Sequence, residues 1–334
     1  MPPRPTPPLR VLTWHVHGSY LDSLIRSGHE FFLPVRDEDG ELKGGIGGWP
    51  WPRDRVHEVP EDKVRELEFD LVLFQHARNW REDGPRILSD RQLAGPRIYV
   101  EHDPPLDDPT ETRHPVDDPD VLLVHVTAFN QLMWDSGRTP TRVIEHGVVD
   151  PAVAWTGEME RGLVVINDIG TRGRRIGRDI YERMKARVPL DLVGMGSREH
   201  GGLGEVTRTE LPAFSARYRF FFHPVRYTSF GMAVCEALMI GMPVVSLATT
   251  EMPSVLEDGR SGVIGTDPEY LIDRAAELVR DRELAARLGR TGQAIARDRF
   301  SIDRFVSDWD RAFGDVTGRS TAGDARGRAV AVPA

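Results

Sequence analysis

The residues with the clearest capacity for chemistry lie between His223 and Gly265. There an apolar strand, Phe220–Phe222, leads into a loop, and Ser229-Phe230-Gly231 opens an apolar helix, Met232–Ile240. The first N–H groups of a helix have no partner within the helix, and the helix dipole is positive at that end. The start of this helix is therefore suited to bind a diphosphate.

A single carboxylate interrupts this apolar helix. Glu236 lies about one turn into the helix, where it can accept hydrogen bonds from ribose hydroxyls, as acidic residues do in other nucleotide-binding α/β folds. Three more acidic residues follow in the next loop and helix, namely Glu251, Glu257 and Asp258. The segment as a whole predicts a nucleotide diphosphate site.

Motifs for metal binding and for serine hydrolysis are not indicated. Cys235 is the one cysteine, which excludes a disulfide within the chain and a cysteine metal cage. His15 and His17 have no carboxylate partner at a suitable spacing, and neither HExxH nor Gly-x-Ser-x-Gly occurs. Acidic triplets at 37–39, 118–120 and 308–310 fall in predicted loops or the last helix and are interpreted as solvated surface. We expect no metal and no cofactor.

The elements that must position these residues alternate between short apolar strands and helical patterns, which is typical of parallel sheets covered by helices. The predicted strands are Arg10–Trp14, Leu71–Phe74, Arg97–Val100, Val121–Val126, Arg142–Ile144, Gly162–Ile166, Leu190–Val193, Phe220–Phe222, Pro243–Ser246 and Gly262–Ile264. Two sheets of about five strands agree better with two doubly wound domains than with one continuous sheet.

Two segments are predicted as loops. Arg36–Pro60 contains five glycines and a Trp-Pro-Trp-Pro step, and Pro104–Pro119 is rich in Pro and Asp. Apolar spacing predicts helices over Pro268–Leu288, which Gly289 can end, and over Ser301–Phe313.

Charge is spread unevenly along the 334 residues, whose formal net charge is −9. Residues 1–150 contain 17 basic and 27 acidic residues, and the remainder is close to neutral. An acidic first half argues against a nucleic-acid surface there, whereas a neutral second half tolerates an anionic ligand. No apolar run approaches the ~18 residues that cross a bilayer. We expect a cytoplasmic enzyme with at most peripheral membrane contact.

The stretch from His223 to Gly265 resembles the nucleotide-sugar site of the family-4 retaining glycosyltransferases (glycosyl transferases group 1), which have the GT-B fold. That family carries two glutamates with seven residues between them, a Phe-Gly step, a Gly-x-Pro-Val-Val strand and a Glu-Asp-Gly turn. The matches in order are Phe230-Gly231, Glu236, Gly241–Val245 and Glu257–Gly259. The first glutamate of the signature falls on Thr228. In the family that carboxylate faces the donor sugar, and the second faces the ribose.

The resemblance implies further donor-binding residues. Asn167–Arg178 stands where the family has a loop with two cations that bind the diphosphate, and Arg172 and Arg175 are the preferred pair, with Arg174 as a third candidate. Gly194 lies in a turn where glycines let the backbone approach a base or phosphate. Ser229, Phe230, Gly231 and Glu236 complete this set.

The resemblance also implies site residues in the first half. Gly18 corresponds to the glycine of a family loop that lies against the donor phosphates and the acceptor. His17 is the candidate acceptor-side residue. His102 lies in the segment Arg97–Asp103, at the end of the predicted strand and near the place of the transferred sugar. Together with Thr228, it is the candidate catalytic residue.

The resemblance therefore predicts two facing Rossmann-like domains with a cleft between them. We expect an acceptor-side domain over 1–150, a nucleotide-sugar-binding domain over 151–300, a crossover helix over 301–317 and a disordered tail over 318–334. The predicted function is transfer of a sugar from a UDP- or GDP-linked donor, with retention and without a metal. The acceptor would be a glycan, a lipid or a small metabolite. A non-catalytic nucleotide-sugar-binding protein and a nucleotide-sugar epimerase stay open as alternatives.

Overall fold

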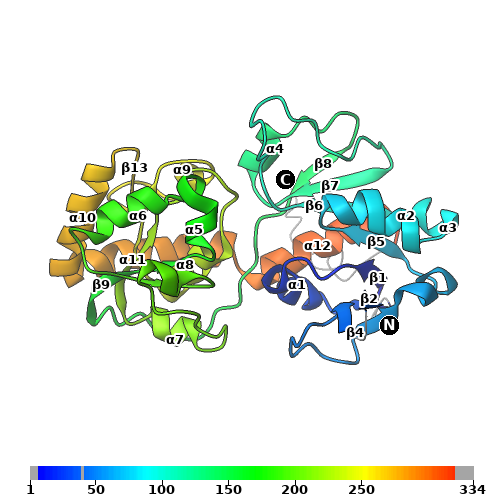
Figure 1. Ribbon diagram of the computed structural model, residues 1–334, viewed down its shortest axis with the longest axis horizontal. Helices are drawn as coiled ribbons and strands as arrows, with labels where there is room; N and C mark the ends of the chain where they lie inside the picture. The colour runs from blue at the N-terminus through cyan, green and yellow to red at the C-terminus, as the bar shows by residue number, and fades with distance from the viewer. Residues whose placement is uncertain (1–6, 39–40, 320–334) are drawn as a thin grey trace, which may run out of the picture. The chain divides into compact units, whose positions relative to one another are not determined.

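The computed structural model describes residues 7–38 and 41–319, and its contacts divide the chain into two compact units. Unit 1 comprises Met1–Gly147 and Ile302–Ala334, and unit 2 comprises Val148–Ser301 (Figure 1). Most of the predicted tail, from residue 320 onward, lies outside the described residues. Each unit contains one sheet, and the two are described separately below.

Unit 1 contains an eight-stranded sheet in the part of the chain that the structure describes. The strand order is β3-β2-β1-β5-β6-β7-β8, β4 also pairs with β2, and every pairing except β2 with β3 is parallel. The strands are β1 (Arg10–Thr13), β2 (Glu30–Glu38), β3 (Glu41–Gly44), β4 (Val56–Pro60), β5 (Leu71–Phe74), β6 (Arg97–Glu101), β7 (Val121–His125) and β8 (Thr141–Val143).

The helices of unit 1 include one from the far end of the sequence. They are α1 (Gly18–Ile25), η1 (Glu61–Glu66), the π-helix η2 (Asn79–Asp83), α2 (Gly84–Ile87), α3 (Asp90–Leu93), α4 (Ala128–Met133) and α12 (Ile302–Thr317). In Figure 1, α12 lies beside α1. Trp309 of α12 is fully buried and donates its indole N–H to the Tyr20 hydroxyl of α1 at 3.2 Å. This α1–α12 contact joins residues almost 300 positions apart.

The expectation of a loop over Arg36–Pro60 is wrong in part, because the end of β2, the hairpin strand β3 and β4 all lie in it. Val56 and Val59 of β4 are buried, whereas all four residues of β3 are exposed. An exposed hairpin strand has no apolar face, so it leaves no periodic signal. Residues 104–119, in contrast, contain no described helix or strand, as predicted.

Unit 2 is built on a five-stranded, all-parallel sheet, within the described residues, in the order β10-β9-β11-β12-β13. The strands are β9 (Met159–Val165), β10 (Leu190–Val193), β11 (Tyr218–His223), β12 (Val244–Leu247) and β13 (Val263–Gly265). Side chains alternate between its two faces: Phe220 and Phe222 pack into one apolar core and Phe221 packs into the other. Both faces are covered, which explains why these strands read as continuous apolar runs.

The helices of unit 2 cover both faces of the sheet. They are α5 (Ile169–Arg172), η3 (Gly173–Ile176), α6 (Arg178–Lys185), η4 (Ser197–His200), α7 (Leu211–Ser215), α8 (Met232–Ile240), α9 (Met252–Val255), α10 (Pro268–Arg280) and α11 (Arg282–Arg299). Residues of α6 and α10 lie in one core, and residues of α8 lie in the other.

The predicted helix over Pro268–Leu288 is in fact two helices. The break is at Asp281, whose side chain accepts a hydrogen bond from the Leu284 N–H at 2.9 Å and caps α11. Gly289 lies inside α11 and does not end it. A Cβ at Gly289 would lie 2.1 Å from the carbonyl oxygen of Gly241, so this glycine permits α11 to approach the end of α8 closely.

Candidate functional site

Unusual backbone conformations gather where the strands of unit 2 end. Asp168, which follows β9, and Thr250, which follows β12, have positive φ angles of 54° and 52°. Gly194, directly after β10, has a φ of 131°. Positive φ at a non-glycine residue costs roughly 1–3 kcal/mol and is concentrated at functional sites. In open parallel sheets, ligands bind outside this carboxyl edge. Both observations indicate that the site of unit 2 lies there.

The arginine-rich loop and the loop before α8 are joined at this edge. The carbonyl oxygen of Arg175 accepts hydrogen bonds from the N–H groups of Arg226 and Tyr227, at 3.0 and 3.2 Å. The Arg226 guanidinium donates to both carboxylate oxygens of Asp179, at 2.6 and 2.8 Å, and lowers the pKa of that carboxyl. A Cβ at Gly177 would lie 1.9 Å from the Pro224 carbonyl oxygen. The arginine loop and the loop before α8, about 50 residues apart in sequence, thus lie in direct contact at the carboxyl edge of the sheet.

The arginines of this loop differ in what they contact. Arg174 binds Asp179 through its side chain at 2.6 Å, so its guanidinium is engaged within the loop. Arg175 is half-buried, and its side chain forms no hydrogen bond or ion pair with another described residue. Arg172 is exposed at the end of α5. Arg175 is therefore the best-placed cation for a ligand, and Arg174 has a structural role.

The start of α8 leaves both space and an unpaired hydroxyl. Gly231 is the N-cap residue, and the nearest atom to a Cβ built on it is Cε1 of His223, at 4.0 Å. The Ser229 hydroxyl is buried and has no hydrogen-bond partner in the structure. Thr228 is half-buried beside it. Phe230 instead stacks on Phe300 in the core, with ring centroids 5.3 Å apart, so only its backbone is available to a ligand.

Glu236 is half-buried on α8. Burial raises the pKa of its carboxyl, and Arg208 partly opposes that shift. The residue lies beside Ala233 and the α7 residues Leu211 and Ser215. Asp258 of the Glu-Asp-Gly turn already has partners within unit 2, since its carboxylate accepts hydrogen bonds from the Ile264 N–H and the Tyr270 hydroxyl.

In unit 1, a polar chain fixes His102 at the carboxyl edge of the sheet. The side-chain amide of Gln75 donates to the Thr13 hydroxyl and the Trp14 carbonyl, both at 3.0 Å. Thr13 donates its own proton to the Leu73 carbonyl, so it must accept from Gln75. The Gln75 amide oxygen therefore faces His102, 3.3 Å from Nε2. This arrangement requires the proton of neutral His102 to be on Nε2 and leaves the lone pair on Nδ1.

Aromatic rings surround His102. Its ring makes edge contacts with His17 and Tyr20, with centroids 4.3 and 4.7 Å away. Burial, followed by neighbouring histidines, holds the pKa of His102 well below its ordinary value. Loss of hydration also lowers the pKa of His17, although nearby Asp103 opposes the shift. These rings form the histidine cluster of unit 1, which consists of His17, His76, His102 and His146.

Gly18 has a packing explanation in the structure. A Cβ there would lie 2.2 Å from the indole of Trp49, so only glycine lets this ring cover the start of α1. Trp49 in turn stacks on Trp51, with centroids 5.1 Å apart. Nδ1 of His15 lies 2.9 Å from the Gly45 carbonyl oxygen. Because a carbonyl oxygen can only accept, His15 is the donor of this hydrogen bond.

Comparison with known proteins shows which family part of unit 2 resembles. The model of the family described as Glycosyl transferases group 1 matches residues 197–295, the segment that contains the loop before α8 and α8 itself. Within unit 2, residues 197–295 are thus similar to the group 1 glycosyltransferases.

Two curated relatives match over short stretches. An N-acetyl-alpha-D-glucosaminyl L-malate synthase from Bacillus anthracis is 27% identical over 90 residues, which are 26% of this chain and 24% of that protein. An O-antigen chain mannosyltransferase B from Escherichia coli is 32% identical over 114 residues, 33% of this chain and 30% of that protein. Each alignment thus spans less than a third of the relative's own length.

Solved structures agree over nearly the whole chain. The Anabaena protein HepE in complex with UDP superposes with a TM-score of 0.69 at 14% identity, and covers 92% of this chain and 100% of that one. At this identity the likeness establishes the fold, which is GT-B, with two Rossmann-like units. The predicted fold class is confirmed.

Sequence reasoning missed two well-placed side chains. Gln75 directly follows β5, and His223 ends β11 beside the start of α8. Burial lowers the pKa of His223 to about 4, so the ring is neutral near pH 7. Each is a polar residue at the end of an apolar strand, and that position is the signal that could have found both.

The described residues contain neither a metal-binding group of side chains nor a membrane-spanning helix. No group of three or more His, Cys, Asp and Glu side chains there could bind a metal ion, the histidine cluster included. Likewise, no helix in residues 7–38 or 41–319 is long and apolar enough to cross a membrane.

Proposed function

We propose that this protein transfers a sugar from a nucleoside diphosphate sugar to an acceptor. The observation that carries the proposal is the joining of the arginine loop to the loop before α8, through the Arg175 carbonyl and the amides of Arg226 and Tyr227. This contact brings cations and the start of a helix to the same strand-end edge. A diphosphate is the ligand that such a combination binds.

In this proposal, the diphosphate is also the leaving group. Arg175 and Arg172, together with the amides of Ser229–Gly231, would stabilise the negative charge that develops on it as the glycosidic bond breaks. The buried, unpaired Ser229 hydroxyl would donate to a phosphate oxygen, which would satisfy a group that the protein alone leaves unsatisfied. Because these groups supply the positive charge, transfer would proceed without a metal.

Glu236 would accept hydrogen bonds from the ribose hydroxyls. The crystal structure of HepE is a complex with UDP, and the shared fold supports a nucleoside diphosphate as the ligand of this protein. Thr228 would contact the donor sugar through a neutral hydroxyl. A neutral hydrogen bond contributes about 0.5–1.5 kcal/mol against about 1.5–3 for one to a charged group. We therefore infer either a donor whose hydroxyl pattern differs from that of glucose or mannose, or weak turnover of those common donors.

Unit 1 would bind the acceptor and supply His102 beside the transferred sugar. Its neutral state, imposed by burial, leaves Nδ1 as an acceptor for a hydroxyl proton. His17, in ring contact with His102, would lie on the acceptor side. The acceptor would be a glycan, a lipid or a small metabolite, and the transfer would retain the configuration of the sugar.

The test is turnover of a panel of UDP-, GDP- and ADP-linked sugars by the full chain, with and without candidate acceptors and with EDTA present. Transfer predicts acceptor-dependent release of the nucleoside diphosphate. Epimerisation of the donor without any acceptor, or binding without turnover, would support the alternatives instead. The curated relatives with assigned activities, a synthase and a mannosyltransferase, favour transfer.

A matched variant tests the donor site itself. Glu236→Ala removes one or two hydrogen bonds to the ribose, each worth about 1.5–3 kcal/mol, and should weaken nucleoside diphosphate binding at least tenfold in calorimetry. Glu283→Ala, at an exposed position at the start of α11, is the control. Unchanged affinity in Glu236→Ala would remove this residue from the site.

A further inference from the structure

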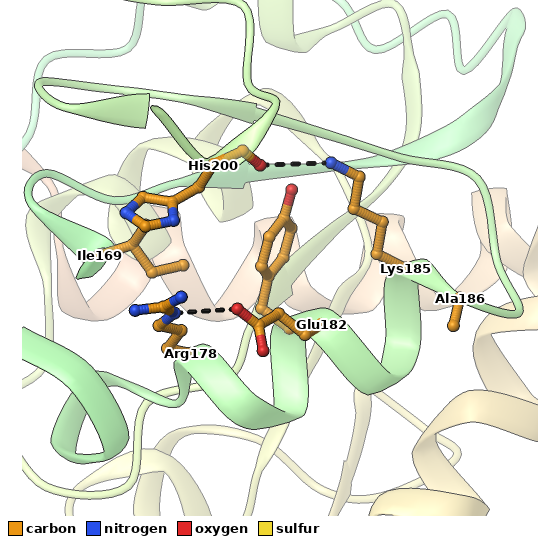
Figure 2. Close-up of a pocket in the computed structure, with 7 residues that line it drawn as sticks. Ile169, Arg178, Glu182, Lys185, Ala186 and His200 are labelled. Atoms are coloured by element: carbon orange, nitrogen blue, oxygen red, sulfur yellow. Dashed lines mark hydrogen bonds and ion pairs between the residues drawn. The ribbon is translucent and has the colours of Figure 1, made fainter. Parts of the chain in front are cut away.

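A hollow that is distinct from the proposed donor site lies in unit 2 between α5, α6 and η4. It encloses about 290 Å³, close to the lower limit of small-molecule sites. The lining residues are Ile169, Arg178, Tyr181, Glu182, Lys185, Ala186 and His200. Figure 2 shows Arg178, Glu182 and Lys185 extending from α6, with His200 facing them from η4. None of these residues is among those assigned to the donor in the proposed function.

One wall of the hollow contains an unsatisfied polar group. The Tyr181 side chain is 1% exposed, and its hydroxyl has no hydrogen-bond partner in the structure. Buried hydroxyls are nearly always paired, either with protein or with a bound molecule. Tyr181 lines the hollow, so its hydroxyl is the candidate donor to a molecule bound there.

The charges of the hollow favour an anion. Lys185 donates only to the carbonyls of Gly201 and His200, at 3.2 and 3.4 Å, and has no carboxylate partner among the described residues. An ammonium has three N–H donors, so one is still available. Arg178 binds Glu182 at 2.8 Å, which leaves the hollow with a surplus positive charge.

Lysine itself is uncommon in this chain. It occurs at three positions, and Lys43 and Lys63 both pair with neighbouring glutamates. Lys185 is the third, and its ammonium lies 5.5 Å from the centre of the Tyr181 ring. The one lysine without a carboxylate partner thus lies beside the one unpaired hydroxyl of the hollow's described lining.

We propose that this hollow binds a small phosphate-bearing molecule, whose oxygens accept hydrogen bonds from the Tyr181 hydroxyl and the Lys185 ammonium. Ile169 begins α5 and Arg178 begins α6, so the occupant would contact both ends of the arginine loop. Occupancy would stabilise the conformation that presents Arg172 and Arg175. The binding site does not depend on the proposed function; only its coupling to donor binding does.

The experiment is titration of the full chain with inorganic phosphate and with glycerol 3-phosphate, followed by calorimetry. We expect saturable binding that Lys185→Met and Tyr181→Phe each weaken about tenfold, as loss of a hydrogen bond to a charged group would. Lys63→Met, at an exposed paired lysine of unit 1, should leave the affinity unchanged. Tighter binding of glycerol 3-phosphate than of free phosphate would identify a phosphorylated metabolite as the ligand, and the reverse would identify free phosphate.

A further variant separates this hollow from the donor site. Arg175→Ala should bind the two probes as the unmodified protein does. If Arg175→Ala abolished binding while Tyr181→Phe and Lys185→Met did not, the phosphate would be in the donor site, and the proposal would be overturned. Absence of saturable binding, or equal affinities in all lysine and tyrosine variants, would overturn it as well. Tyr181→Phe removes one oxygen only, and its unfolding curve checks that it folds.

Discussion

Gln75 acts on His102 by selecting which ring nitrogen is protonated. Replacing it with leucine removes the acceptor opposite Nε2, so we expect the ring of Gln75→Leu to populate both neutral tautomers in ¹⁵N NMR. Turnover should fall roughly tenfold, which corresponds to the loss of about one hydrogen bond. The donor KM should not change, because the side chains proposed to bind the diphosphate and the ribose lie in unit 2.

Gln131→Leu is the matched control, since it removes only a surface hydrogen bond to Thr141. A single Nε2–H tautomer that persists in Gln75→Leu would show that Gln75 has no positioning role. Lowered turnover with an unchanged tautomer would lead to the same conclusion.

His223 predicts a pH dependence of stability. Its folded-state pKa of about 4 lies below the ordinary value of 6.5, so the unfolded chain takes up a proton first as the pH falls. The stability from the neutral ring is complete above pH 6.5 and is lost as the pH falls through 4. In urea unfolding, His223→Phe should therefore show a smaller decline in stability over this interval than the unmodified protein. Parallel declines would contradict the assigned pKa.

At the scale of elements, Gly177 joins two loops. Its φ is 80°, and a Cβ would lie 1.9 Å from the Pro224 carbonyl oxygen, so Gly177→Ala must separate the arginine loop from the loop before α8. Gly173 also has a positive φ, of 58°, although its ψ of −135° differs from the 27° of Gly177, and no described atom lies within 4 Å of a Cβ added to it.

Gly173→Ala should therefore cost only about 1–3 kcal/mol of stability from its backbone. Gly177→Ala should cost more and also weaken nucleoside diphosphate binding about tenfold, as measured by urea unfolding and calorimetry. Equal losses in the two variants would show that the contact with Pro224 is unimportant.

The sequence predicts elements well where both faces of a strand are buried. Leu71–Phe74 matches β5 to the residue because it is an apolar run. Leu190–Val193 likewise matches β10, in which Asp191 is the one polar residue and Pro189 and Gly194 flank the strand. The pattern fails for β3, whose four residues are all exposed, and it also missed β2, although Phe31–Pro34 of that strand are buried. Gly289 shows a second limit: glycine marks a helix end or a close helix contact equally well, and only the Gly241 carbonyl opposite it decides between them.

For the site, motif order locates the segments but not the contacts. The loop around Arg175 is recognisable from the sequence, but its contact with Arg226 is a tertiary fact that spacing does not contain. Thus Arg172, Arg174 and Arg175 could not be distinguished before the ion pair between Arg174 and Asp179 was seen. The roles of His102, Thr228 and Glu236 stay predictions.

At the scale of the whole molecule, unit 1 depends on a helix from beyond unit 2. Trp309→Ala empties a fully buried site between α12 and α1 and should cost about 3–5 kcal/mol. Hydrogen exchange should show reduced protection in β1 and α1, with β9–β12 less affected. Trp155→Ala in unit 2, whose indole N–H bonds the Tyr218 carbonyl, should give the reverse pattern. Uniform loss of protection in both variants would show that the two units unfold as one.

The α1–α12 contact also determines the order in which the molecule can be completed on the ribosome. Unit 2 is one continuous stretch, and all of its strands emerge before α12 is made. At about 5–20 residues per second, synthesis from Gly147 to Ile302 takes roughly ten to thirty seconds. Throughout that interval Tyr20 of α1 lacks its contacts with Phe305 and Trp309 of α12, and the apolar surface left uncovered is one to which chaperones could bind. The unit that is translated first is therefore finished last, and a nonsense mutation after Ser301 would leave unit 2 whole and unit 1 incomplete.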